Sequence, residues 1–322
     1  MTAPSKQHLD ALSRFANRYA DDAAKVIARG DDSLAIYARN LVLSTMTEMF
    51  RWEYPATKWA SGELISIGPY GVDDGAREYG WLELGHVGNA GIVADNARDL
   101  PTADLEGAYN TARVHTIATS IEYSTQDVRA SRLQGMFDIA SEKVSAAREA
   151  YDRYVNGLIV NGDATKGLKG VLTVGGLSIA ATTGAWASSA TPVQIVNDFT
   201  LAVQEGFTST DTVEEPNTAV FPSAVWTRLS TLQNSIASDI TVLEYLKRAF
   251  PHITLWTFDP SIPATTAVIY NRDKSRIRVV MPLILKPLPV ESRGLNFSIP
   301  FESRYGGVMA PRPRARLLLT GI

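Results

Sequence analysis

The chain has 322 residues, of which 45% are hydrophobic and 20% are charged, values typical of globular proteins and not of disordered ones. Its formal net charge of -3 argues against a dedicated nucleic-acid-binding protein, whose surface would be basic. The absence of cysteine excludes disulfides, thiolate catalysis and cysteine zinc sites. Neither a secretory leader nor a membrane span is expected, because no sufficiently long apolar run occurs.

Two helices are predicted before residue 51. Apolar residues recur at spacings of three and four from Leu9 to Ile27, which predicts an amphipathic helix over residues 5–29 that ends at Gly30. A second helix is expected over residues 33–50. Because it is apolar over much of its surface, it needs cover from other segments or from other chains.

Residues 62–107 are rich in glycine and carry nine acids against two bases, or about seven net negative charges. Short β-prone pieces lie between the glycines, at residues 64–67 and 79–84. The segment has too few large side chains to form its own core, so we predict an extended hairpin arm. The residues expected to reach another subunit are Asp73, Asp74, Arg77, Glu78, Glu83, Asp95 and Asp99.

A strand over residues 113–123 and a long helix over residues 134–160 come next. Ser124 and Asp127 offer a hydroxyl and a carboxylate for capping a helix N-terminus. The long helix would measure roughly 40 Å at 1.5 Å per residue, and its predicted buried side holds Phe137, Ala140, Val144, Ala147, Tyr151, Tyr154 and Leu158. Three glycines are expected to shape the turn after it: Gly162, Gly167 and Gly170.

Residues 170–290 are predicted to form a mixed α/β region. Helices are expected over residues 191–205, 222–232 and 241–250, and strands over 219–221 and 253–258. Residues 267–270 and 277–280 are predicted to pair as a hairpin. Strict alternation from Leu295 to Phe301 predicts a half-buried strand, and Gly306 with Gly307 turns the chain into a last segment that ends in three leucines.

The C-terminal part is basic, with ten bases against three acids from Arg272 onward. Its charge is nearly opposite to that of the arm, so one surface is expected to lie on the other, either within one chain or between neighbours. Solvated faces of opposite sign are the alternative. The basic residues expected at a contact between subunits are Arg293, Arg304, Arg312, Arg314 and Arg316.

No catalytic or cofactor-binding constellation is found. The four histidines are scattered, and paired acids such as Asp73-Asp74 lie in loops where no burial would raise their pKa. The spacing Gly162-x4-Gly167 differs from a phosphate-binding loop, because Leu168 stands where the lysine is required. We therefore expect no enzyme activity, no cofactor and no metal.

Several phrases, in their order along the chain, resemble the major capsid proteins of tailed bacteriophages, the Hong Kong 97-like family. Each phrase is weak by itself, but their common order is specific. They are Tyr54-Pro55, residues 64–67, Ala94 to Pro101, Ser124 to Ala130, Asn161-Gly162-Asp163 with Gly167 to Gly170, and Arg304 to Val308 with Pro311.

The resemblance implies an α+β Hong Kong 97-like fold whose copies assemble as pentamers and hexamers into an icosahedral head around double-stranded DNA. Scaffolding, portal and head-decoration proteins are the further partners it implies, with assembly in the host cytoplasm and no membrane contact. Its domains would be an N-terminal arm (1–60), an extended loop (61–107), a peripheral domain with a spine helix (108–167), an axial domain (168–285) and a C-terminal return to the peripheral domain (286–322).

One departure from the family pattern has a chemical consequence. The founding member of the fold crosslinks its subunits through a lysine on the extended loop, whereas residues 63–106 here contain no lysine. We therefore expect a shell without isopeptide bonds. Two alternatives remain, an encapsulin-type nanocompartment shell of the same fold and a soluble enzyme, and the second lacks a reactive cluster.

Overall fold

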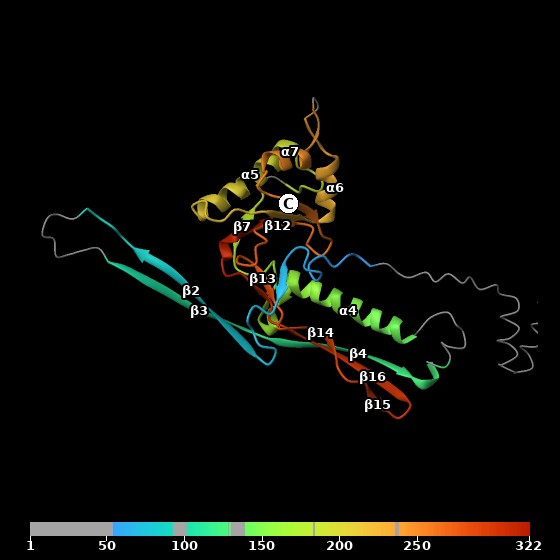
Figure 1. Cartoon of the computed structure of the whole chain (residues 1–322). Coiled ribbons are helices and arrows are strands. Elements are labelled where there is room, and N and C mark those ends of the chain that lie inside the picture. The colour runs from blue at the N-terminus through green and yellow to red at the C-terminus, as the bar shows by residue number, and fades with distance from the viewer. Residues whose placement is uncertain (1–53, 93–101, 128, 130–138, 183, 236–237) are drawn as a thin grey trace, which may run out of the picture. The chain divides into compact units, whose positions relative to one another are not determined.

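The computed structural model describes residues 54–92, 102–127, 129, 139–182, 184–235 and 238–322 (Figure 1). The fold described is that of the compact unit Pro55–Ile322. The two helices predicted before residue 51 lie outside the described residues. Helix and strand labels follow Figure 1.

A five-stranded sheet organises one region of the unit. The strands run in the order β11 (Leu255–Phe258), β8 (Thr218–Phe221), β12 (Thr266–Tyr270), β18 (Arg316–Thr320) and β7 (Leu177–Ala180). Alternate residues of its strands enter two different cores, as the period of two in a strand requires. In β12, for example, Ile269 packs with α5 (Pro192–Ser209), α6 (Ser223–Thr231) and α7 (Val242–Ala249), whereas Val268 packs on the opposite side.

The long helix α4 (Ile139–Asn161) supplies the core on that opposite side. Val155, Leu158 and Ile159 pack there with Tyr270 of the sheet. Its 23 residues correspond to about 35 Å. Farther along the helix, Ala147 packs on a second sheet, in which β16 (Asn296–Tyr305) pairs with β4 (His115–Ser124) on one edge and with β14 (Leu283–Pro287) and β15 (Glu291–Arg293) on the other.

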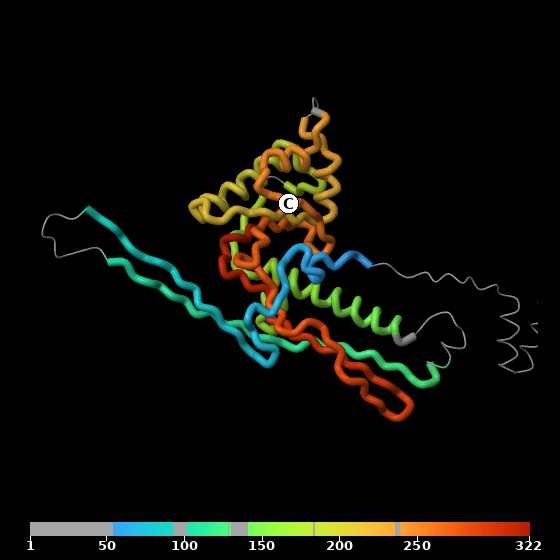
Figure 2. The backbone as a smooth tube through the Cα atoms, in the orientation of Figure 1, coloured from blue at the N-terminus to red at the C-terminus, as the bar shows by residue number. Residues whose placement is uncertain are grey.

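The acidic, glycine-rich segment forms the predicted hairpin. Strand β2 (Glu78–Gly88) pairs antiparallel with β3 (Ala103–Arg113) over eleven residues, and β4 follows β3 after Val114 (Figure 2). A small sheet at its base joins β1 (Ser66–Gly68), β13 (Arg278–Val280) and β17 (Val308–Met309), so an early and a late segment of the chain lie side by side. We call β2 and β3 the hairpin arm.

The remaining elements are short. They are β5 (Gly162–Asp163), β6 (Leu168–Lys169), β9 (Gln233–Ser235), β10 (Ser238–Thr241) and the 3₁₀ turns Ala164–Lys166 and Pro313–Ala315. None of the helices in the described ranges is long and apolar enough to cross a membrane.

Glycines shape the turn after α4. Gly162 and Gly167 have φ of +73° and +70°, in the left-handed region that disfavours other residues. A Cβ at Gly170 would lie 2.6 Å from the carbonyl oxygen of Val160. The chain therefore crosses itself here at a distance that only glycine permits.

Replacing Gly170 with alanine is expected to lower the free energy of unfolding by about 1–3 kcal/mol, because the backbone must move apart. The matched control is Gly157→Ala inside α4, where an added Cβ meets nothing within 4 Å. That variant should gain about 0.5–1 kcal/mol from helix propensity. Urea unfolding of both variants checks the pair, and equal stabilities would contradict the crowded turn.

Several local predictions are confirmed, including α5 to α7, β8, β11 and β16. Ser124 and Asp127 also form the predicted cap, since each backbone N–H donates to the other residue's side chain at 3.1 Å. A strand was expected at residues 64–67, but the observed strand β1 begins at Ser66 and ends at Gly68. Leu64 and Ile65 precede it and are buried in the core. The strand expected at residues 113–123 begins at His115, because Arg113 ends β3.

Other predictions are wrong in pairing or facing. Residues 267–270 and 277–280 form strands but do not pair as a hairpin, because β12 pairs with β8 and β18 while β13 pairs with β1 and β17. Val144 and Tyr154 of α4 are exposed, and Val155 and Ile159 are buried in their place. The start predicted at residue 134 lies outside the described residues.

The last strand also differs from expectation. β18 lies between β12 and β7 in the five-stranded sheet, so the end of segment 286–322 belongs with strands from residues 168–285. Its three leucines alternate between the two cores of that sheet. The other domain boundaries stay predictions.

Candidate functional site

The base of the hairpin arm is fixed to its own chain. Tyr79 is buried, and its hydroxyl donates to the carbonyl oxygen of Gly306 at 3.0 Å. Its ring packs with Val114, Val280 and Met309, and burial raises the pKa of this tyrosine to about 12. The phenol therefore keeps its proton near neutral pH, and the hydrogen bond holds the start of the arm.

Strand register separates two faces of the arm. Residues directly opposite each other in an antiparallel pair point to the same side, so Leu82 shares a face with Tyr109, and Glu83 shares the other with Ala108. The apolar face consists of Leu82, Leu84, Leu105 and Tyr109. The acidic face carries Glu83, Asp104 and Glu106, together with the exposed Val87.

The apolar face has little cover within its own chain. The exposed fractions of its side chains are 59% for Leu82, 60% for Leu84, 60% for Leu105 and 70% for Tyr109. A two-stranded ribbon cannot bury one face by itself. Contiguous exposed apolar side chains of this size mark an interaction surface.

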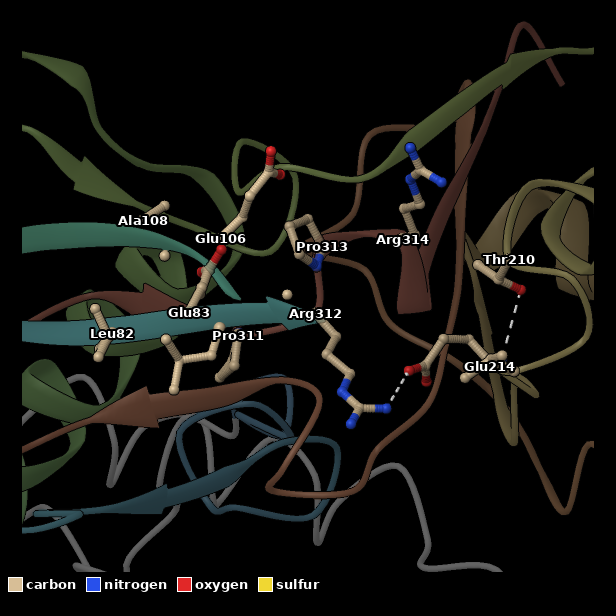
Figure 3. Close-up of a pocket in the computed structure, with 14 residues that line it drawn as sticks. Leu82, Glu83, Glu106, Ala108, Thr210, Glu214, Pro311, Arg312, Pro313 and Arg314 are labelled. Atoms are coloured by element: carbon tan, nitrogen blue, oxygen red, sulfur yellow. Dashed lines mark hydrogen bonds and ion pairs between the residues drawn. The ribbon is translucent and has the colours of Figure 1, made fainter. Parts of the chain in front are cut away.

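The arm borders a groove of about 950 Å³ in the same chain, which Leu82 and Leu84 line together with Glu83 and Glu106. Figure 3 shows Glu83 and Glu106 from the arm on one side, and Arg312 and Arg314 from the segment before β18 on the other. Among the described residues no ion pair joins these acids to these arginines. The two predicted charge surfaces therefore face each other within one chain, without direct pairing.

The side chain of Arg312 extends to Glu214 instead (Figure 3). Glu214 is 7% exposed, and its carboxylate receives Arg312 at 3.0 Å and Arg276 at 2.6 Å. Two cations around one buried carboxylate balance the cost of removing its charge from water. This cluster joins the loop after α5 to the segments before β13 and β18.

The acids predicted to reach a neighbour have mostly local partners. Asp73 accepts the backbone N–H of Gly75 at 3.2 Å, a bond that lowers the pKa of its carboxyl group. Glu78 pairs with Arg113 across the arm at 3.2 Å. Asp74 and Arg77 are exposed, whereas Asp95 and Asp99 lie outside the described residues. Their role between subunits stays a prediction.

The predicted arginines divide into internal and exposed ones. Arg316 is 4% exposed and donates to the carbonyl oxygen of Val171 at 2.6 Å, so the prediction that it faces another subunit is wrong. Burial lowers its pKa to about 10, which still leaves it charged at neutral pH. Arg304 donates to the Ala76 carbonyl oxygen beside the arm's base, and Arg314 to that of Ser209.

Arg293 stays on the surface, with a side chain 76% exposed and paired to Glu291 in the same strand.

The count of charges in the sequence did not reveal the apolar face of the arm. The signal that could have found it is the alternation of Leu82 and Leu84 within a segment otherwise poor in large side chains. In the part of the chain that the structure describes, no cluster of acids and histidines could hold a metal ion.

In a comparison with protein families, the model described as "Major capsid protein" matches residues 88–322, more than two thirds of the chain. No curated protein matches. Many solved structures share the fold. The capsid of Myoviridae phage XM1 superposes with a TM-score of 0.76 at 19% identity, over 88% of this chain and 98% of that one.

Two further likenesses are to particles of other kinds. The capsid of a native GTA particle gives a TM-score of 0.62 at 17% identity, over 90% of this chain and 98% of that one. A virus-like particle from Pyrococcus furiosus gives 0.51 at 12% identity, over 80% and 90% of the two chains. The α+β fold is thus the Hong Kong 97-like capsid fold.

Proposed function

Because the chain belongs to the major capsid protein family, we propose that it assembles as pentamers and hexamers into an icosahedral phage head around double-stranded DNA. The apolar face of the hairpin arm carries the proposal. Four large side chains stay mostly exposed on a ribbon whose base is held by the bond from Tyr79 to Gly306. A second copy of the chain would cover this face. The arm would then correspond to the extended loop that the family resemblance implies.

The basis for docking differs from the one that charge suggested. The acidic face borders arginines of its own chain, so the charges favour the arm's placement in one subunit. The apolar face then supplies contact with the next subunit. Obligate contacts between subunits are commonly apolar, and they exceed about 2,000 Å² in total.

Electron microscopy of the purified protein tests assembly. Closed hollow shells of regular size are expected, and dispersed monomers at high concentration would contradict the proposal. A nanocompartment shell is the second candidate, favoured by the likeness to the Pyrococcus furiosus particle. Nuclease-protected DNA in particles from the native source separates the two, because only the phage head encloses a genome.

We extend the proposal to other partners. Contact with packaged DNA would be independent of sequence and modest, given the net charge of -3. Scaffolding, portal and head-decoration proteins would join the head in the host cytoplasm. An enzymatic role finds no support in the family, which is structural.

Mature particles are expected to lack covalent links between subunits, since residues 63–106 contain no lysine. A denaturing gel should show one band near 35.0 kDa. The same gel of unassembled protein is the control. A ladder of covalent oligomers in particles alone would contradict this expectation.

A further inference from the structure

Tyr109 makes a contact inside its own arm although its side chain is 70% exposed. Its ring lies across Gly80 of the neighbouring strand, because a Cβ added at Gly80 would overlap the Tyr109 hydroxyl oxygen and would lie 2.5 Å from Cζ. In the register of the arm Gly80 faces Thr111 and Tyr109 faces Leu82, so the two residues are diagonal neighbours on one face. The ring therefore covers the backbone of β2.

Space, and not backbone conformation, requires glycine at position 80. The φ of Gly80 lies outside the left-handed region, so another residue could adopt the same backbone angles. Any Cβ there would push the Tyr109 ring away. Glycine inside a strand weakens it, because it offers no side chain to pack. An aromatic ring placed over such a glycine restores packing between the strands, and Tyr109 does this for Gly80.

The contact lies where the arm leaves its own subunit. Tyr79, the neighbour of Gly80, is buried and bonds to Gly306, and its ring stacks on Trp81 with centroids 5.8 Å apart. Successive residues of a strand point to opposite faces. Tyr79 and Trp81 therefore lie on one face of the arm's base and the ring of Tyr109 on the other, so rings hold the ribbon from both sides.

We propose that Tyr109 is a positioning residue for assembly: by covering Gly80, it fixes the direction in which the arm leaves the subunit before a second copy binds. The inference rests on the proposed function and does not depend on which surface of the second copy receives the arm. A ribbon already held in its assembled direction loses less conformational entropy on docking, so each contact is stronger.

A Tyr109 that contributes only docking area would behave differently. Replacement of Gly80 would then leave assembly unchanged, because all four apolar side chains of the arm remain. A positioning role instead makes assembly sensitive to Gly80, a residue with no side chain to offer a partner. The two roles are therefore separated by substitutions at position 80.

A double-mutant cycle on unassembled subunits tests the contact, read by hydrogen exchange of the backbone amides in β2 and β3. Tyr109→Leu keeps an apolar side chain but removes the ring, and it is expected to speed exchange about threefold. In the Gly80→Ala background the new Cβ has already displaced the ring. There the same substitution should change exchange by less than about 1.5-fold.

Gly85→Ala supplies the matched background. Gly85 lies on the opposite face of the arm, and an added Cβ meets only the carbonyl oxygen of Glu106, at 3.8 Å. There Tyr109→Leu should keep its full effect of about threefold. Tyr109→Phe keeps the ring and should match the wild type. Equal effects of Tyr109→Leu in the Gly80→Ala and Gly85→Ala backgrounds would overturn the inference.

Assembly of the single variants tests the consequence. Gly80→Ala should raise the subunit concentration at which shells first form by at least about threefold. Gly85→Ala, which carries the same exchange of glycine for alanine in a strand, should keep the wild-type concentration, and so should Tyr109→Phe. Thermal unfolding of the three subunits should match wild type, which excludes a general loss of stability.

Shells that form from Gly80→Ala at the wild-type concentration would overturn the inference and leave the proposed function intact. Wild-type protein that forms no shells would instead refute the proposed function. The exchange cycle would still decide whether Tyr109 holds the arm, because it is measured on single subunits. The two failures are therefore distinguishable.

Discussion

Replacing Leu84 with lysine is expected to abolish shell assembly while the subunit stays folded. Leu84 is 60% exposed in the single chain and lies outside the cluster that Tyr79 forms with Val114, Val280 and Met309. The folded subunit therefore loses little, and far-ultraviolet circular dichroism and thermal unfolding should match wild type. Sedimentation and electron microscopy should show capsomers or monomers instead of shells.

The size of the effect follows from burial. Covering the exposed part of one leucine contributes about 1–2 kcal/mol, and lysine adds the larger cost of placing a charge against an apolar surface. Since about 1.4 kcal/mol is tenfold in an equilibrium constant, each contact weakens by more than tenfold. A closed shell repeats that contact many times, so the yield of shells should fall well beyond tenfold.

The matched control is Ala108→Lys, which adds the same charge to the same hairpin on its opposite face, beside Glu83. Shells should form from this variant at near wild-type yield. Normal shells from Leu84→Lys, or equal loss in both variants, would show that the apolar face is not the docking surface.

Replacing Glu214 with alanine is expected to lower the free energy of unfolding by about 3–5 kcal/mol. The carboxylate is 7% exposed and binds Arg276 and Arg312. Its removal leaves Arg276, whose side chain is only 22% exposed, without the negative charge that it pairs with. Denaturant unfolding of purified subunits measures the change. The loss of unfolding free energy should fall near the lower limit of about 3 kcal/mol, because the Arg312 side chain is half exposed and can turn to water.

Glu244→Ala is the matched control for that substitution. Glu244 pairs with Arg248 on α7 at 2.6 Å, but both side chains are largely exposed. Its loss should cost no more than about 0.5 kcal/mol. Similar losses in the two variants would mean that burial does not decide the strength of the Glu214 cluster.

The hairpin and most helices could be predicted because their signals are local. Glycine spacing and β-prone pieces predicted the arm, and Pro192 after Thr191 predicted the start of α5, where the structure has a capping box. Strand pairing is not local. β12 and β13 are neighbours in sequence, yet each pairs with strands far along the chain, and no short-range pattern reveals that choice.

The site was predicted in part, for a physical reason. Counting charges identified the arm and the arginines, but it could not tell an exposed guanidinium from Arg316, which sits inside the fold and binds carbonyl oxygens. Which side of the arm faces its own subunit depends on strand register and on the bond between Tyr79 and Gly306. Both come from tertiary structure.

A reconstruction of shells assembled from the wild-type protein tests the central claim most directly. It should place Leu82, Leu84, Leu105 and Tyr109 of every arm against another copy of the chain, with each side chain buried. Closed shells in which these four side chains remain open to solvent would contradict the account, as would a preparation that contains no shells.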